Sequence, residues 1–188
     1  MENCAYIESR ENRGHPPLKL AALYGHTDAA CALVSAGADV NTQRNDGASA
    51  LGVASQEGYI DTVNILLDNG AQIETRDKSH DHTPLWYAVA SGHTDVVRAL
   101  VSAGADVNTQ CTYNGVSALS FASNKGHIDI VNILVDNGTE IECTDNEGRT
   151  PLWLAAAGGQ TDVVRALVSA GADVNTCLLY TSPSPRDS

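Results

Sequence analysis

The residues best suited to chemistry form a short run, His80, Asp81 and His82. Imidazole and carboxylate groups bind zinc, but a stable site needs three or four ligands, and the sequence brings no further ligand near this run. The glycine-rich phosphate loops, the H-E-x-x-H helix and the G-x-S-x-G nucleophile turn are also absent. We therefore interpret the run as part of a loop, and the sequence predicts no catalytic, metal or cofactor site.

The two tryptophans of the chain, Trp86 and Trp153, are 67 residues apart. Tryptophan is enriched at the hot spots of protein interfaces. Large aromatic side chains are also mostly part-buried, so packing against the next helix is an equally good interpretation. The regular spacing indicates that both residues occupy the same place in a repeated unit.

A repeated unit runs through the chain, marked by glycines at intervals of 33 or 34 residues: Gly37, Gly70, Gly104, Gly138 and Gly171. A period in this range is typical of stacked repeats without a single globular core. Two versions of the unit alternate, and Leu18, Leu85 and Leu152 are each 67 residues apart. The copied unit is therefore interpreted as a pair of repeats.

Each unit predicts two short helices. Thr83 suits the N-cap of the first helix, and Pro84 suits its first position. In the second helix, apolar residues at i, i+3 and i+4, such as Val97 and Leu100, predict one buried stripe. Gly104 then provides a left-handed cap, and the polar stretch after it predicts a projecting turn.

This pattern, T-P-L-x-x-A…G-H…L…G-A-D-V-N, resembles that of ankyrin repeats and covers residues 1–176. The resemblance implies an all-α solenoid of stacked helix-turn-helix units with projecting β-hairpin-like loops. We expect a partial repeat at 1–14, five repeats at 15–47, 48–81, 82–115, 116–148 and 149–176, and a non-repeat tail at 177–188. The family's histidine after T-P-L is replaced here by Lys19, Gly52, Trp86, Ser120 and Trp153, so its usual hydrogen bond is not expected.

Both ends of the chain predict a fragment of a longer array. Residues 2–11 align with 68–77, so the chain begins inside a repeat and Met1 is interpreted as internal. The tail CLLYTSPSPRDS resembles a translated sequencing adapter; a disordered Ser/Pro-rich tail is the alternative. Without capping repeats, Val164, Leu167 and Val168 are expected to be partly exposed, and the end repeats to fray or associate.

In ankyrin proteins the loop tips and the pair before Gly-His carry recognition. By this resemblance, the candidate protein-binding residues are Tyr24, Asn45, Gln56, Glu57, His82, Trp86, Ser91, Tyr113, Asn124, Lys125, Arg149 and Trp153. Asn41, Asn108 and Asn175 are similar to sites modified by asparaginyl hydroxylases and are candidate modification sites. By contrast, His26, His93 and His127 are interpreted as hydrogen-bonding groups, and the D-V-N aspartates as turn formers.

The composition narrows the class of partner. A net charge of -12 argues against binding to a phosphate backbone, which needs a basic face. No apolar run is long enough for a membrane span, and the first residues carry charges where a signal peptide is apolar. Five cysteines without a repeating position predict free thiols. We expect an intracellular, cytoplasmic and monomeric protein.

The leading hypothesis is a non-enzymatic scaffold that binds an unidentified protein through its concave helix face and loop tips. The alternative is the targeting part of a larger enzyme or channel, with the chemistry or the membrane spans elsewhere in the full protein. The full-length transcript would separate these two hypotheses.

Overall fold

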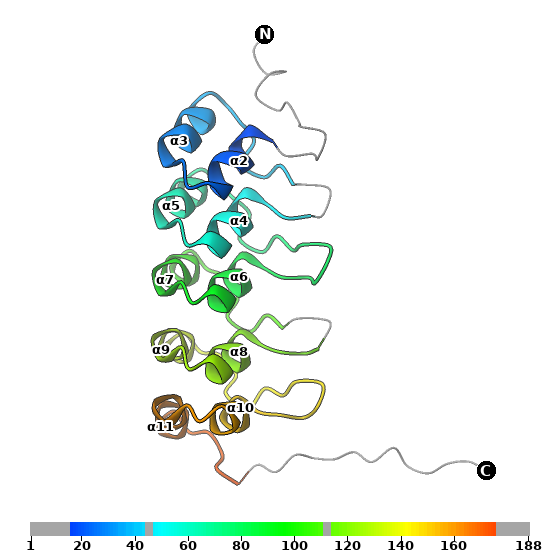
Figure 1. Ribbon diagram of the computed structural model, residues 1–188, viewed down its shortest axis with the longest axis vertical. Coiled ribbons are helices and arrows are strands. Elements are labelled where there is room, and N and C mark those ends of the chain that lie inside the picture. The colour runs from blue at the N-terminus through cyan, green and yellow to red at the C-terminus, as the bar shows by residue number, and fades with distance from the viewer. Residues whose placement is uncertain (1–15, 44–46, 111–113, 176–188) are drawn as a thin grey trace, which may run out of the picture.

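The computed structural model describes residues 16–43, 47–110 and 114–175, and its ten helices form five stacked pairs (Figure 1). The first helix of each pair, here called an inner helix, is α2 (Pro17–Leu23), α4 (Ala50–Glu57), α6 (Pro84–Ser91), α8 (Ala118–Lys125) or α10 (Pro151–Ala157). The second, here called an outer helix, is α3 (Thr27–Ser35), α5 (Ile60–Asp68), α7 (Thr94–Ser102), α9 (Ile128–Asp136) or α11 (Thr161–Ser169). The predicted all-α solenoid is confirmed.

Inner and outer helices form two columns, and each helix contacts the next helix of its own column. The hairpin loops project from the inner column, away from the outer helices (Figure 1). In the described residues β pairing is limited to one isolated bridge, Gln110 with Ser117, at the base of a loop. No helix of the described ranges has both the length and the apolar character needed to cross a membrane.

Among the described inner helices, α4, α6, α8 and α10 begin at the predicted Ser or Thr caps, whereas α2 begins after Pro16 without a side-chain cap. The backbone N–H of Trp86 donates to Thr83 Oγ1 at 3.2 Å, and Pro84 is the first helical residue of α6. A left-handed glycine closes three of these helices, as at Gly92, where φ is 78°. Gly104 also has a positive φ, 96°, which confirms the predicted left-handed turn after α7.

The core lies between the two columns. Leu85 of α6 and Val97 and Leu100 of α7 are at most 1% exposed, which confirms the predicted stripe. In the last described repeat Leu167 is also fully buried, so its expected exposure is wrong. It points into the column interface, where α11 packs on α10, whereas Val168, one residue further round the helix, is 42% exposed.

Consecutive repeats are joined at one equivalent position by a side chain that accepts a hydrogen bond from the next repeat's backbone. The four pairs are Asn41 Oδ1 with Gln72 N at 2.7 Å, Glu74 Oε1 with Asp106 N at 2.9 Å, Asn108 Oδ1 with Glu140 N at 2.8 Å, and Glu142 Oε1 with Asp173 N at 2.9 Å. Asparagine and glutamate alternate along the stack. The alternation in sequence is therefore also an alternation in how the repeats are joined.

The D-V-N aspartates form turns, as predicted. Asp39, Asp106 and Asp173 each accept, through Oδ1, the backbone N–H of the asparagine two residues on, at 2.9 Å. This is the local hydrogen bond that makes aspartate frequent in turns.

Candidate protein-binding face

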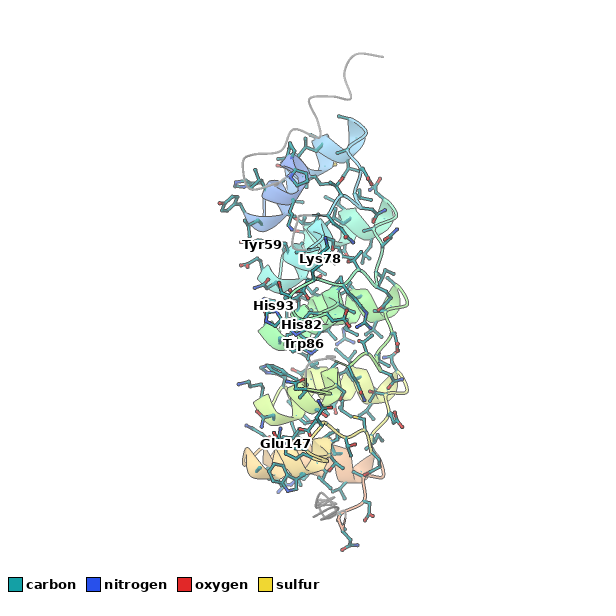
Figure 2. The ribbon with its side chains drawn as sticks, turned by 90° about the vertical axis from the view of Figure 1, so that its right-hand side faces the viewer. Tyr59, Lys78, His82, Trp86, His93 and Glu147 are labelled. Atoms are coloured by element: carbon teal, nitrogen blue, oxygen red, sulfur yellow. The ribbon has the colours of Figure 1, made fainter. Side chains whose placement is uncertain are left out.

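A stack of aromatic rings lies where the hairpin loop before α6 meets that helix. The rings of His82 and Trp86 are nearly parallel, with centroids 3.6 Å apart and planes 6° apart. His80 stacks on His82 at 5.1 Å, and Phe121 of the next repeat lies 5.3 Å from Trp86. Figure 2 shows His82 and Trp86 together in the middle of the stack of repeats. The ring stack thus joins one hairpin loop and two inner helices.

The position of these rings follows from the helix start. His82 precedes the N-cap Thr83, and Trp86 follows three residues after that cap, so the two side chains lie over the same turn. The same two places in the fifth repeat hold Arg149 and Trp153, with the guanidinium carbon 5.8 Å from the ring centroid. A planar side chain therefore lies over a tryptophan in both repeats.

The two tryptophans differ in exposure. Trp86 is half-buried, and its Nε1 is buried with no hydrogen-bond partner among the described residues. Trp153 is 37% exposed. Trp86 thus packs against the next repeat, where it contacts Phe121. The ring of Trp153 is instead open to solvent on the inner side.

Two aspartates that the sequence analysis did not single out order the loops below these rings. Asp77 accepts backbone N–H groups from Ser79, His80 and His82, the last at 2.6 Å. Burial would raise the pKa of Asp77, but these N–H donors outweigh it and hold the pKa below its ordinary value. Asp77 therefore fixes the loop that carries His82.

Asp145 has the same role before α10. It accepts the backbone N–H groups of Glu147 and Arg149, and its Oδ2 lies 2.7 Å from Arg149 Nε. Burial opposes ionisation here too, but the hydrogen bonds and the charge of Arg149 lower the pKa of Asp145. The shared signal in sequence is an aspartate at equivalent places in the loops that precede the two tryptophan helices.

The histidine–aspartate–histidine run belongs to this loop structure. Burial lowers the pKa of His82, so its ring is neutral in the stack at neutral pH. Asp81 pairs with Arg76, with Oδ2 2.6 Å from Nη1. Within the described ranges, no group of three or more His, Cys, Asp or Glu side chains is arranged to hold a metal ion.

The remaining predicted residues lie at the ends of the inner helices. Tyr24 is 60% exposed, and Gln56, Glu57, Ser91, Asn124 and Lys125 are exposed at the C-terminal ends of α4, α6 and α8. The ammonium of Lys125 lies 5.6 Å from the ring centroid of Phe121. This contact connects Lys125 to the ring stack. Asn45 and Tyr113 lie outside the described residues.

Phe121 is the ring that sequence reasoning missed. It stands at the position of Tyr87 in the repeat, one residue beyond the tryptophan position, where no aromatic motif marks it. The sequence did offer one signal for the contact between Phe121 and Lys125. The two residues are four positions apart on α8, and residues at this spacing are neighbours on a helix.

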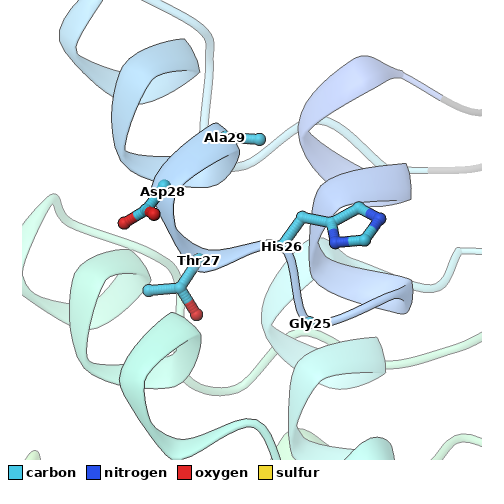
Figure 3. A pocket seen from close by; sticks show the side chains of 5 residues that line it. All are labelled: Gly25, His26, Thr27, Asp28 and Ala29. Carbon is cyan, nitrogen blue, oxygen red and sulfur yellow. The ribbon is translucent and has the colours of Figure 1, made fainter.

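Of the three Gly-His turns, the one at His93 makes a hydrogen-bonding contact of the predicted kind. His93 Nε2 lies 3.1 Å from the carbonyl oxygen of Gln56 in the preceding repeat. In the first repeat the turn lines a shallow hollow, shown in Figure 3, formed by residues 25–29. Asp28 already places a negative charge at this helix start, so the hollow is unsuited to an anion.

Two of the three candidate modification sites take part in the junctions between repeats. Asn41 Nδ2 donates to Gly70 O at 3.1 Å, in addition to the bond that its Oδ1 accepts. Asn108 Oδ1 also lies 3.3 Å from Thr139 Oγ1. Asn175 is exposed. Modification of these residues remains a prediction.

Comparison with known proteins agrees with this architecture. Residues 2–77, 18–111 and 103–176 each match the family model described as Ankyrin repeats (3 copies). The chain belongs to the ankyrin repeat family. Over 91 residues, 46% of this chain, it is 38% identical to the ankyrin repeat and KH domain-containing protein mask of Drosophila melanogaster. The matched segment spans 2% of that protein's length.

Proposed function

We propose that the chain is a non-enzymatic scaffold that binds a partner protein through its inner helices and hairpin loops. The observation that carries the proposal is the set of rings held on ordered loops, with Trp153 left 37% exposed. Aromatic side chains offer a large contact area at a small loss of conformational entropy, which is why they dominate interface hot spots.

A comparison of helix sequences between repeats also supports the inner side as the binding surface. The outer helices α7 and α11 have the identical sequence TDVVRALVS. The inner helices of the same repeats differ, PLWYAVAS in α6 and PLWLAAA in α10. In these two repeats the outer helix is thus copied unchanged, whereas the inner helix varies, as expected of a surface that adapts to a partner.

The alternative is that these repeats form the targeting part of a larger enzyme or channel. The same face would then dock the substrate or anchoring partner of that larger protein. We also retain hydroxylation of Asn41, Asn108 and Asn175, which intact-mass analysis of protein from its own cell would reveal as the mass of added oxygen atoms. An intracellular, monomeric state completes the proposal, in keeping with the free thiols of Cys31 and Cys143.

Site-specific photo-crosslinking tests the proposal. A benzophenone amino acid replaces Trp153 on the inner side or, as control, Arg98, which is exposed on the outer helix α7. We expect discrete protein adducts from position 153 and none from position 98 after irradiation in cells. Adducts from position 98 alone, or the same adducts from both positions, would place binding elsewhere and refute the proposal.

A further inference from the structure

Charge is divided unequally between the two sides of the stack. In the described residues, the inner side comprises 16–25, 47–58, 75–92, 114–126 and 143–158, and the outer side is the rest. The inner side holds five basic and five acidic residues, whereas the outer side holds two basic residues, Arg98 and Arg165, and thirteen acidic ones. The negative charge of the described chain therefore belongs to the outer side, and the inner side is neutral.

Lys125 is the cation of the inner side that is best placed for a ligand. It is exposed, forms no ion pair within the described ranges, and lies 5.6 Å from the ring centroid of Phe121. Its place at the C-terminal end of α8 favours a positive charge, because the helix dipole is negative there. The ammonium is thus held beside the ring stack without an anionic partner.

Arg149, the cation next to Trp153, is already neutralised. Its guanidinium pairs with Asp145 and Glu147 at 2.7 and 2.9 Å while it lies over Trp153. Two of the chain's own cations, Lys125 and Arg149, thus lie over Phe121 and Trp153. A cationic ligand seeking those ring faces would compete with them and would be repelled by Lys125.

From this arrangement we infer that Trp86, Phe121, Lys125 and Trp153 bind an acidic, extended segment of a polypeptide. A carboxylate of the segment pairs with Lys125, and its apolar side chains contact the neutral rings. Basic segments are instead attracted to the acidic outer side, away from the rings. The inference rests on the proposed function and adds the chemistry of the partner.

The test selects ligands without assuming a sequence. Random dodecapeptides displayed on phage are selected on the immobilised full chain, and the consensus peptide is synthesised with a fluorophore for anisotropy titrations. We expect a consensus with Asp or Glu beside an aliphatic or aromatic residue. Lys125→Glu should weaken its binding about tenfold or more, because an attractive charge pair becomes repulsive.

The matched control is Arg98→Glu, which makes the same change of charge on the outer side and should leave the affinity within about twofold. Lys125→Arg should retain binding, and circular dichroism should show unchanged helix content in all variants. A Lys/Arg-rich consensus, no consensus, or equal effects of Lys125→Glu and Arg98→Glu would overturn the inference. In those cases crosslinking from position 153 would still decide the proposed function independently.

Discussion

Two glycines in left-handed turns allow the backbone and packing effects of an added methyl group to be separated. Gly104 has φ 96° and Gly58 has φ 78°, so alanine is conformationally strained at both. We expect Gly104→Ala to lower the free energy of unfolding by about 1 kcal/mol, the usual penalty for a β-carbon in this region. Nothing lies within 4 Å of the added Cβ at Gly104, so no further loss is expected.

At Gly58 the same methyl group meets the next repeat. Its Cβ would lie 2.5 Å from Cε1 and Nδ1 of His93, much closer than two such atoms can approach. His93 must then move, and its 3.1 Å contact with Gln56 O is lost. A hydrogen bond contributes about 1 kcal/mol, so we expect Gly58→Ala to cost about 2 kcal/mol in total.

Urea unfolding followed by circular dichroism measures both values, and a double-mutant cycle isolates the clash. In the background of His93→Ala the ring is absent, so Gly58→Ala should cost only about 1 kcal/mol, like Gly104→Ala. Equal costs of the two glycine substitutions in the parent chain, or additivity of Gly58→Ala with His93→Ala, would refute the reasoning.

Three further predictions concern buried polar groups. Ser123→Ala should raise the free energy of unfolding, by up to about 1 kcal/mol in urea titrations, because its buried hydroxyl has no partner among the described residues. Ser120→Ala removes a hydroxyl that is hydrogen-bonded to Ser117, so this substitution should instead lower the free energy of unfolding. The pKa of Asp145 is lower in the folded state than its ordinary value of 3.8, so ionisation of Asp145 stabilises the fold. This stabilisation is fully present above pH 3.8 and is lost as the pH falls through the folded pKa. Asp145→Asn should therefore make the free energy of unfolding depend less on pH in this acid range. Burial raises the pKa of Cys143, so peptide mapping should show alkylation of exposed Cys31 well before Cys143 at neutral pH.

Sequence reasoning predicted what depends on neighbours along the chain. The N-cap of Thr83, the left-handed Gly104 and the apolar stripe through Val97 each follow from local rules, and the period places them in a stack. The partial burial of Trp86 was left open, because it depends on Phe121, which lies 35 positions away in sequence and is brought near by the stacking of repeats. The expected exposure of Leu167 failed for a similar reason: its own inner helix covers it without any further repeat.

The parts of the candidate binding site are divided between the two alternating versions of the repeat. The loops ordered by Asp77 and Asp145 close one version of the repeat, and the tryptophans they support begin the next version. Duplication of a pair of repeats therefore copies the whole arrangement, which consists of the aspartate, the tryptophan and the planar side chain over it. Duplication of a single repeat would separate these parts. The repeat between them provides Phe121 and Lys125 rather than another tryptophan. The two tryptophan positions thus stand two layers apart on one side of the stack, with Lys125 on the layer between them. This spacing favours an extended segment over a compact ligand.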